Sequence, residues 1–401
     1  MRMGLLAESL SQNGHNVVWW SSTFIHGSKD YYSNCYKKIQ ISGHEKLILL
    51  HSQVSYKKNI SLQRLIYHHN LGIEFRKHCE EEEQPDIILC SYPIVQFCIE
   101  AEHYAKKNNI PLIVDVRDLW PDIFVRAFPQ NMHKIVRMGL FPLDIQANYV
   151  MKRADAIIGV VPSMVQWGLQ RAHRKKTRMD QVIYIGSTSN LADNQEELKL
   201  ALEKWNLLGV NKSTWNLCFV GTLSSNSLDL STCIEAAKGI SKEYPDFRLI
   251  ICGDGDGREN YKKLAANSKN IIFAGWCDKY QIQSLFSIGN AGLYPYKNWD
   301  DFKNAFGNKI VKYMSGGLPV VSSLTGFSKK YIEKYRIGLV YREKDQNSLK
   351  KVIKSLIVNP EKSKSMGVKA KKCFNKDFDV LVINNKFEKL MSEIIERVEK
   401  R

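Results

Sequence analysis

The chain has 401 residues, 44% hydrophobic and 25% charged, and its 58 Lys and Arg outnumber its 41 Asp and Glu for a formal charge of +17. This composition excludes a disordered chain, and the length predicts two domains of roughly 200 residues each. Because the sequence contains no apolar run of the roughly 18 residues that span a bilayer and no secretory signal pattern, we expect a cytoplasmic protein.

The excess of positive charge and the cysteine pattern indicate which ligands the chain is expected to bind. A strongly basic chain favours an anionic partner, such as a phosphorylated substrate, an anionic membrane face or nucleic acid. Nucleic acid is the weakest of these, because the sequence shows no RNP-type aromatic motif, helix-turn-helix spacing or zinc knuckle. The nine cysteines include no C-x-x-C pair and no Cys/His cluster at zinc spacing. We therefore expect buried free thiols and no metal site.

The first half of the chain alternates between helical and strand-like segments. An amphipathic helix is predicted at residues 3–13, and further helices are predicted at 61–80, 94–107 and 131–153. Six short apolar runs predict strands: Val17–Trp20, Lys46–Leu50, Asp86–Cys90, Leu112–Val116, Ala156–Val160 and Val182–Ile185. This alternation is typical of a parallel, doubly wound sheet. Such domains normally open on a strand and a Gly-rich turn, so we expect that the first strand is missing or that the start codon is placed late.

A polar, strand-poor segment at residues 187–214 precedes a second alternating series. Its predicted strands are Leu217–Val220, Arg248–Cys252, Ile271–Ala274, Ala291–Tyr294, Pro319–Ser322 and Gly338–Tyr341. The α/β pattern therefore predicts two Rossmann-like domains that face each other across a cleft at the carboxyl ends of their strands. The expected limits are an N-terminal domain at 1–190, a linker at 191–214, a C-terminal domain at 215–380 and a C-terminal helix at 381–401.

Two glycine-bearing turns follow predicted strands of the second domain. Gly221 and Thr222 come directly after one strand, where a glycine lets a ligand approach the backbone closely. An ordinary strand-end glycine explains this turn equally well. Gly253 and Gly255 follow the next strand, but they do not complete the G-x-G-x-x-G fingerprint and are a weak signal by themselves.

The most informative segment of the second domain runs from Asn304 to Val321. A helix that starts near Ala305 would direct free N–H groups and the positive end of its dipole toward a ligand, which suits a diphosphate. The candidate residues at this helix start are Gly307, Asn308 and Lys309, of which Lys309 adds a formal positive charge. A Gly-Gly pair then ends the helix, and Leu-Pro-Val-Val resumes the sheet.

Taken together, the motifs resemble those of the retaining nucleotide-sugar glycosyltransferases of family 4, which have the two-domain GT-B fold. The resemblance covers nearly the whole chain. It rests on Phe219–Leu223, Gly253–Gly255, Phe273–Gly275, Asn308-Lys309 with Tyr313 and the following Gly-Leu-Pro-Val, and Asp115–Asp122. The last stretch, Asp-Val-Arg-Asp-Leu-Trp-Pro-Asp, is similar to the branch that builds bacterial surface polysaccharides, including O-antigen and capsule.

The resemblance implies a hexosyltransferase or an N-acetylamino-sugar transferase. Such an enzyme moves a sugar from a nucleotide-diphosphate sugar, its co-substrate, to a lipid-linked or glycan acceptor with retention, and it needs no other cofactor. The first domain then binds the acceptor and the second binds the donor. Metal is not expected either, because the helix start and Lys309 can offset the charge of the donor diphosphate.

The chain also departs from the family pattern. The family commonly has Glu at two positions eight residues apart, and the second contacts the donor ribose. Here these positions correspond to Asn304 and Lys312, and an ammonium only donates hydrogen bonds whereas a carboxylate accepts them. Lys312 therefore serves the donor differently, or the chain is a catalytically impaired homologue that acts as a binding or scaffolding subunit.

In the first domain, Asp115, Arg117 and Asp118 are the candidate catalytic residues. They come after Leu112–Val114 and are expected at the carboxyl end of that strand, where they could orient an acceptor hydroxyl or relay a proton. An ion pair of Arg117 that only fixes the loop is an equally good interpretation.

The densest positive run is Arg171–Arg178. Such a run is usually a solvated face, but an enzyme with a lipid-linked acceptor benefits from contact with an anionic bilayer. We therefore expect peripheral attachment at the inner face of the cell membrane.

Overall fold

The computed structural model describes residues 2–58, 61–126, 128–189, 194–266 and 268–400. The chain divides into two compact units, which we call the N-terminal unit (Met1–Tyr184 with Ile383–Arg401) and the C-terminal unit (Ile185–Val382). The division differs from the sequence-based limits because the end of the chain returns to the N-terminal unit. The boundary expected between residues 190 and 191 lies outside the described residues.

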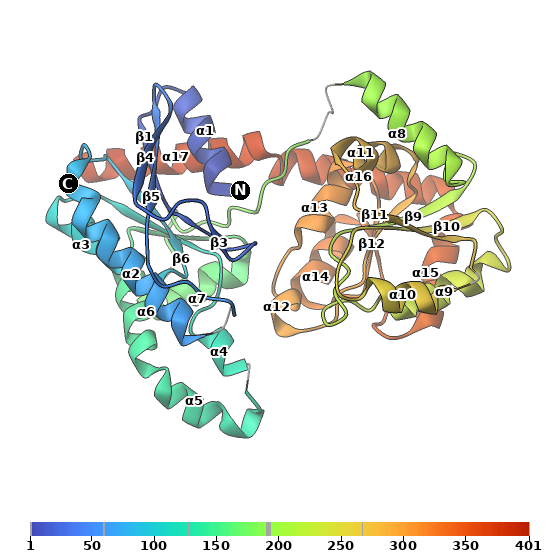
Figure 1. Cartoon of the computed structure of the whole chain (residues 1–401), viewed down its shortest axis with the longest axis horizontal. Helices are drawn as coiled ribbons and strands as arrows, with labels where there is room; N and C mark the ends of the chain where they lie inside the picture. Colours follow the sequence, from blue (N-terminus) through green and yellow to red (C-terminus); the bar gives the residue numbers. More distant parts are fainter. Residues whose placement is uncertain (1, 59–60, 127, 190–193, 267, 401) are drawn as a thin grey trace. The chain divides into compact units, whose positions relative to one another are not determined.

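The N-terminal unit contains two three-stranded sheets (Figure 1). One has the order β1-β5-β4 and the other the order β6-β7-β8, and a small hairpin pairs β2 with β3. The strands are β1 (Val17–Ser22), β2 (Phe24–Ile25), β3 (Asp30–Tyr31), β4 (Lys37–Ser42), β5 (Glu45–Leu50), β6 (Ile88–Tyr92), β7 (Leu112–Val116) and β8 (Ala156–Gly159). All neighbours in the two larger sheets are parallel except β4 and β5, which are antiparallel.

Two features of these sheets differ from the sequence-based expectation. The strand predicted at Val182–Ile185 is reduced to an isolated bridge between Val182 and Gly159. Pairing is limited to this bridge because Val182 lies opposite Gly159, the last residue of β8. Strand β4 was not predicted, since its residues alternate weakly and its side chains are mostly exposed.

Helices cover both faces of the sheet β6-β7-β8. The α-helices of the N-terminal unit are α1 (Arg2–Gln12), α2 (Leu62–His78), α3 (Val95–Lys107), α4 (Asp122–Arg126), α5 (His133–Gly139), α6 (Phe141–Arg153), α7 (Pro162–Ala172) and most of α17 (Val380–Glu399). Alternate residues of β7 point to opposite faces. Val114 and Val116 pack in the core with α2, α3 and α6, whereas Ile113 packs with residues of α1 and α17. This two-sided burial explains the continuous apolar run of the strand.

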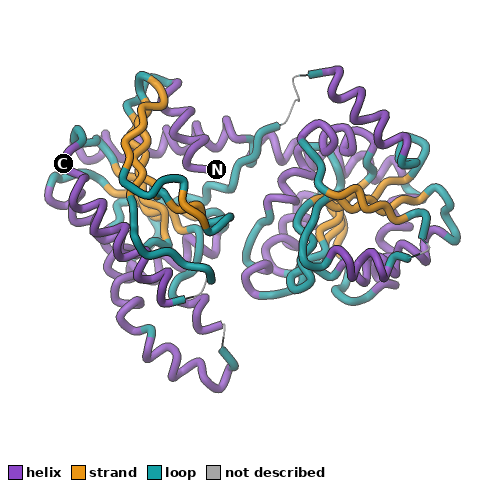
Figure 2. The backbone as a smooth tube through the Cα atoms, in the orientation of Figure 1, coloured by secondary structure: helices purple, strands orange, loops and turns teal. Residues whose placement is uncertain are grey.

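The C-terminal unit has one six-stranded sheet whose strands are all parallel, in the order β11-β10-β9-β12-β13-β14. This is the strand order of a doubly wound domain. The strands are β9 (Trp215–Val220), β10 (Phe247–Cys252), β11 (Ile271–Gly275), β12 (Ala291–Tyr294), β13 (Val320–Ser322) and β14 (Gly338–Val340). Figure 2 shows helices on both sides of this sheet.

The helices of the C-terminal unit connect these strands in the expected alternation. They are α8 (Gln195–Leu207), α9 (Leu230–Ser241), α10 (Arg258–Leu264), α11 (Lys279–Ile288), α12 (Asp300–Lys303), α13 (Asn308–Ser315), α14 (Gly326–Tyr335), α15 (Gln346–Ile357) and α16 (Pro360–Asp377). Helix α8 lies in the segment expected to be a linker. It is anchored by the buried Trp205, whose indole N–H donates to the Gln281 carbonyl oxygen at 3.0 Å.

Candidate active site

The side chain of Lys309 covers the turn after β9. Gly221 has a φ of +145°, and a Cβ on it would lie 1.8 Å from Lys309 Cε. Glycine is therefore required here, both for the backbone conformation and for the approach of the lysine stem. The neighbouring Thr222 is exposed to solvent. Gly221 and Lys309, which the sequence analysis treated as separate elements, thus lie against each other.

The turn after β10 packs directly against the turn after β9. Gly253 has a φ of +133°, and its Cβ would lie 2.0 Å from the carbonyl oxygen of Gly221. Gly255 has a φ of +154°, and its Cβ would lie 2.7 Å from the carbonyl oxygen of Leu223. The N–H of Leu223 donates to the carbonyl oxygen of Asp254 at 2.9 Å. These glycines thus hold two strand-end turns together, whatever ligand they also meet.

Helix α13 begins later than the sequence predicted. The expected start was near Ala305, but the helix begins at Asn308 because Gly307, the N-cap residue, has an extended backbone with ψ of 141°. No side chain among the described residues caps this helix start. The first N–H groups of a helix have no partner inside it, so those at the start of α13 are available to a ligand.

A buried tyrosine fixes α13 against the sheet. The Tyr313 hydroxyl donates to the carbonyl oxygen of Leu293 in β12 at 3.0 Å and accepts from the N–H of Val220 in β9 at 3.1 Å. Its ring covers Gly292, where a Cβ would lie 2.2 Å from the ring carbon Cγ. The helix start and the turn after β9 are therefore held at the same edge of the sheet.

Lys309 is the principal cation at this edge. Its ammonium donates to the hydroxyl of Tyr296 and lies 5.5 Å from the centre of the Phe219 ring. Burial among these groups lowers the pKa of Lys309 to about 8. Because burial disfavours the charged form, a bound anion would restore it. An anion placed beside this ammonium would pair with it in partly buried surroundings.

Lys312 and Asn304 occupy different surroundings. Lys312 lies one turn further along α13, and burial lowers the pKa of its half-buried ammonium. Asn304 is exposed and lies at the end of α12, where its side chain donates to the carbonyl oxygen of Asp300 at 3.0 Å. Of these two positions, only Lys312 shares the helix that begins at Asn308.

Aromatic residues near Lys309 form a group that the sequence analysis missed. The rings of Tyr294 and Tyr296 lie 4.5 Å apart, and Phe302 packs edge-on against Tyr296 at 4.8 Å. Trp299 stacks on Phe302, and about half of its surface is exposed. The aromatic spacing in Tyr-Pro-Tyr-Lys-Asn-Trp was the available signal. These rings offer flat surfaces on which a base or a sugar face could stack.

In the N-terminal unit, the three candidate catalytic residues lie in different environments. Asp115 is part of β7, within the predicted strand, and its side chain is fully buried. Burial raises the pKa of Asp115, although Arg2 approaches it at 3.6 Å. Arg117 is exposed, and Asp118 accepts a hydrogen bond from the N–H of Leu119 at 2.9 Å. The ion pair in this region thus joins Asp115 to Arg2.

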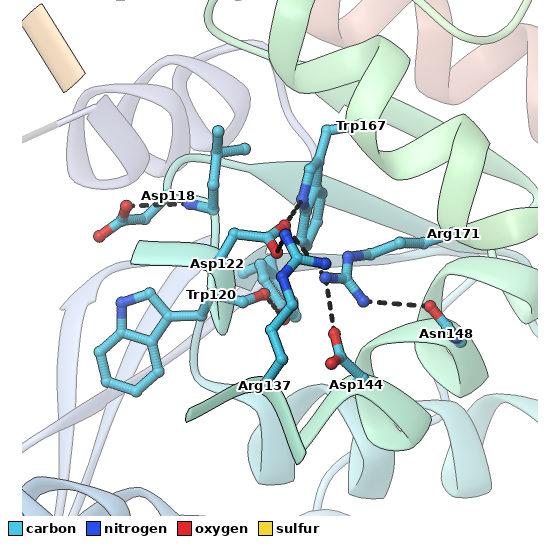
Figure 3. Close-up of polar contacts among 10 residues, drawn as sticks. Asp118, Trp120, Asp122, Arg137, Asp144, Asn148, Trp167 and Arg171 are labelled. Carbon is cyan, nitrogen blue, oxygen red and sulfur yellow. Dashed lines mark hydrogen bonds and ion pairs between the residues drawn. The ribbon is translucent and has the colours of Figure 1, made fainter. Parts of the chain in front are cut away.

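Asp122, the last residue of the Asp-Leu-Trp-Pro-Asp segment, joins several elements of the N-terminal unit (Figure 3). Its carboxylate accepts from the indole N–H of Trp167 at 2.6 Å and from Arg171 at 3.1 Å, and Arg137 lies 3.4 Å away. Burial alone would raise the pKa of this carboxyl. The hydrogen bonds from Trp167 and Arg171 outweigh burial, so the pKa lies below its ordinary value. Asp144 is a second carboxylate partner of Arg171, at 2.8 Å.

A second group that the sequence analysis missed surrounds the indole of Trp120. The His68 ring stacks on Trp120 with centroids 5.2 Å apart, and the guanidinium of Arg64 lies 4.6 Å from the Trp120 ring centre. Burial lowers the pKa of His68 to about 3, so its imidazole is neutral near pH 7. His68 and Arg64 are contributed by α2, and their sequence carries no motif that would have identified them.

Among the described residues, no three His, Cys, Asp or Glu side chains are grouped so that they could hold a metal ion. No helix in the described ranges has the length and apolar character needed to cross a membrane. All nine cysteines are free, and seven are buried as expected, whereas Cys35 is exposed.

Comparisons with known proteins identify the class of this fold. Residues 178–373 match the family described as Glycosyl transferases group 1. No curated protein sequence matches the chain. Among solved structures, it is similar to the sucrose-phosphate synthase tll1590 of Thermosynechococcus elongatus, with 17% identity, a TM-score of 0.69 and coverage of 98% of this chain and 92% of that one.

Two further solved structures have the same fold. HepE of Anabaena in complex with UDP has 17% identity and a TM-score of 0.60, over 80% of this chain and 82% of HepE. WaaG, a glycosyltransferase involved in lipopolysaccharide biosynthesis, has 13% identity and a TM-score of 0.60, over 97% of this chain and 95% of WaaG. At these identities the likeness shows the fold alone.

The fold and the matched region together define a GT-B glycosyltransferase with two Rossmann-like domains. The region that matches Glycosyl transferases group 1, residues 178–373, contains every donor-site candidate from Gly221 to Lys312. The fold class and the enzyme class expected from the sequence are thus confirmed.

Proposed function

We propose that the protein transfers a sugar from a nucleotide-diphosphate sugar to a lipid-linked or glycan acceptor during surface-polysaccharide biosynthesis, with retention of the anomeric configuration. One observation carries the donor half of the proposal: the partly buried ammonium of Lys309 beside the uncapped start of α13. Helix N–H groups and an ammonium in a low-dielectric position suit a diphosphate. HepE, which has a similar fold, has been solved with UDP-glucose, which supports a nucleotide sugar as donor.

The reaction depends mainly on stabilising the leaving group. The bond between the anomeric carbon and a diphosphate oxygen breaks, so that negative charge develops on the departing nucleoside diphosphate. The oxygen of an acceptor hydroxyl bonds to the anomeric carbon, and the proton of that hydroxyl is released to the departing diphosphate. Lys309 and the N–H groups at the start of α13 would stabilise this charge as it develops. Gly221 and Gly253 would let the diphosphate approach the backbone, and the Thr222 hydroxyl could donate a hydrogen bond to a phosphate oxygen. The proposal needs no cofactor besides the nucleotide sugar.

The acceptor half rests on the N-terminal unit. The resemblance of residues 115–122 to the surface-polysaccharide branch of family 4 supports a lipid-linked or glycan acceptor, and so does the structural likeness to WaaG. We propose Asp118 as the carboxylate that orients the acceptor hydroxyl, because it lies in the loop after β7. The full burial of Asp115 and its proximity to Arg2 favour a positioning role for that residue.

A thermal-shift screen against nucleoside diphosphates tests the donor half. A ligand that binds the folded state stabilises it by about 2.7 kcal/mol at a concentration of 100 Kd. We expect one nucleoside diphosphate to raise the melting temperature in the wild type and to do so much less in Lys309→Met. If the shift is the same in both proteins, the donor site has been assigned incorrectly.

A catalytically impaired homologue that acts as a binding or scaffolding subunit is the second candidate. The observation that favours it is the half-buried ammonium of Lys312 where the family commonly has a carboxylate. Release of nucleoside diphosphate from the matching nucleotide sugar, in the presence of a lipid-diphosphate glycan acceptor, separates the two functions. Binding without turnover would favour the scaffolding function.

A further inference from the structure

Helix α5 and the beginning of α6 expose large apolar side chains along the same stretch of chain. Ile135 is 69% exposed, Met138 77%, Phe141 62% and Ile145 53%. None of the seven residues of α5 is buried. Single exposed apolar residues are common, but a run of four within eleven residues is typical of a surface that contacts something else. We call these four residues the α5–α6 apolar surface.

The exposure of these four side chains follows from the way the segment is held in the N-terminal unit. Leu140 and Leu143 turn inward and pack against the core of the N-terminal unit. Arg137 ties α5 to Asp122, the carboxylate that also binds Trp167 and Arg171 (Figure 3). The inner side of the segment is therefore held in place while the apolar residues point away from the core.

The charges beside the apolar surface are positive. Lys134 and Arg137 are exposed next to Ile135 and Met138, and α5 contains no acidic residue. The nearest carboxylate in α6, Asp144, already pairs with Arg171 at 2.8 Å. Exposed apolar side chains interleaved with cations are characteristic of helices that lie in the interface of an anionic membrane.

The basic run Arg171–Arg178 is less suited to this role than the sequence suggested. Arg171 pairs with Asp122 and Asp144, and Arg174 binds Asp180 through two hydrogen bonds of 2.6 and 2.7 Å. These internal carboxylates neutralise two of the cations that were expected to attract lipid.

We propose that the α5–α6 apolar surface inserts into the interface of an anionic bilayer, with Lys134 at the level of the lipid phosphates. The proposal rests on the proposed function, because a lipid-linked acceptor would be met at that surface. A second copy of the chain is a poorer occupant, since a two-fold contact would bring the same cations together. Anionic lipid neutralises them instead.

Co-sedimentation of the full chain with vesicles tests the proposal. The vesicles contain phosphatidylglycerol with phosphatidylcholine, or phosphatidylcholine alone, at 0.1 M and 1 M salt. We expect binding to the anionic vesicles that largely survives 1 M salt, because insertion is apolar while screening shortens the Debye length to about 3 Å. In Ile135→Glu with Met138→Glu, the partition coefficient should fall at least about tenfold.

The matched control introduces the same charges at exposed apolar residues elsewhere. Leu207→Glu with Leu381→Glu changes side chains that are 88% and 68% exposed, and this variant should bind vesicles like the wild type. Equal losses in both double variants would overturn the proposal, and so would wild-type binding by Ile135→Glu with Met138→Glu. Sedimentation velocity without vesicles tests whether a second copy of the chain occupies this surface instead. A wild-type dimer that Ile135→Glu with Met138→Glu dissociates would assign the surface to self-association and also overturn the proposal.

A transfer assay with a short-chain, water-soluble acceptor separates this inference from the proposed function. Transfer without any vesicle binding would overturn the membrane surface alone. Vesicle binding that depends on Ile135 and Met138 without any transfer would overturn the proposed function alone. We expect Ile135→Glu with Met138→Glu to transfer to the soluble acceptor at the wild-type rate.

Discussion

Raising the pH through the titration of Lys309 should weaken binding of the donor diphosphate. The pKa of this ammonium is about 8 in the free protein, below its ordinary value of 10.5. A bound diphosphate favours the charged form, so affinity should be highest below pH 8 and fall by about tenfold per pH unit above it, until the pKa of the bound state is reached. Binding near pH 8 should therefore be accompanied by proton uptake.

Removing the charge gives the size of the effect. A hydrogen bond to a charged group contributes about 1.5–3 kcal/mol, so Lys309→Met should weaken binding by roughly tenfold to a hundredfold at pH 7 and abolish the pH dependence. In the free protein the charge on Lys309 has the opposite effect, because it lowers the stability of the fold instead of favouring a bound ligand. A lysine with a depressed folded pKa destabilises the fold below pH 8, and this penalty is relieved as the pH rises from 8 toward 10.5. Lys309→Met should accordingly raise the melting temperature of the free protein, with an upper limit of roughly 3 kcal/mol.

Titration calorimetry in two buffers of different ionisation enthalpy measures both the affinity and the proton uptake. Lys354→Met is the matched control, because Lys354 pairs with Glu243 at 2.6 Å on the surface of the C-terminal unit and should leave binding unchanged. Unchanged affinity in Lys309→Met would refute this reasoning, and so would the absence of proton uptake by the wild type near pH 8.

Three further changes test other parts of the account. Asp122→Asn should lower the free energy of unfolding by about 1–3 kcal/mol, because buried donors lose a charged acceptor; urea titration measures this, and an unchanged midpoint would contradict it. Asp118→Asn should lower turnover while the nucleoside-diphosphate affinity stays at the wild-type value, and an equal loss of affinity would remove it from the acceptor role. Gly253→Ala should destabilise the fold by more than about 2 kcal/mol, since its φ is +133° and its Cβ would meet backbone at 2.0 Å. Gly209→Ala, at φ +71° with nothing within 4 Å, should have a smaller effect on the same melting curve.

Local patterns predicted much of the C-terminal unit. Strands such as Leu217–Val220 and Arg248–Cys252 are apolar on both faces, so their runs are visible in the sequence. The glycine turns and Lys309 also have local signatures, because a strand-end glycine and a helix start are each specified by a few neighbouring residues. Helix α8 was missed because its inward side consists of little more than Ala201 and Trp205, and the rest of it reads as a polar linker.

Long-range pairs could not be predicted. Arg2 approaches Asp115 from a helix at the start of the chain, and Arg171 reaches Asp122 from α7. Such contacts depend on how elements distant in sequence pack, and no local spacing records them. The predicted strand Leu112–Val116 includes Asp115, but for the same reason its pairing with Arg2 could not be predicted.

The most direct test of the central claim is the transfer product itself. The wild-type chain is incubated with the nucleotide sugar whose diphosphate gives the largest thermal shift and with a short-chain lipid-diphosphate glycan acceptor. Mass spectrometry and NMR then identify the product. We predict that the acceptor gains one sugar with the anomeric configuration of the donor, and that Lys309→Met forms this product at least about tenfold more slowly. A chain that binds the diphosphate but never extends any acceptor would contradict the account.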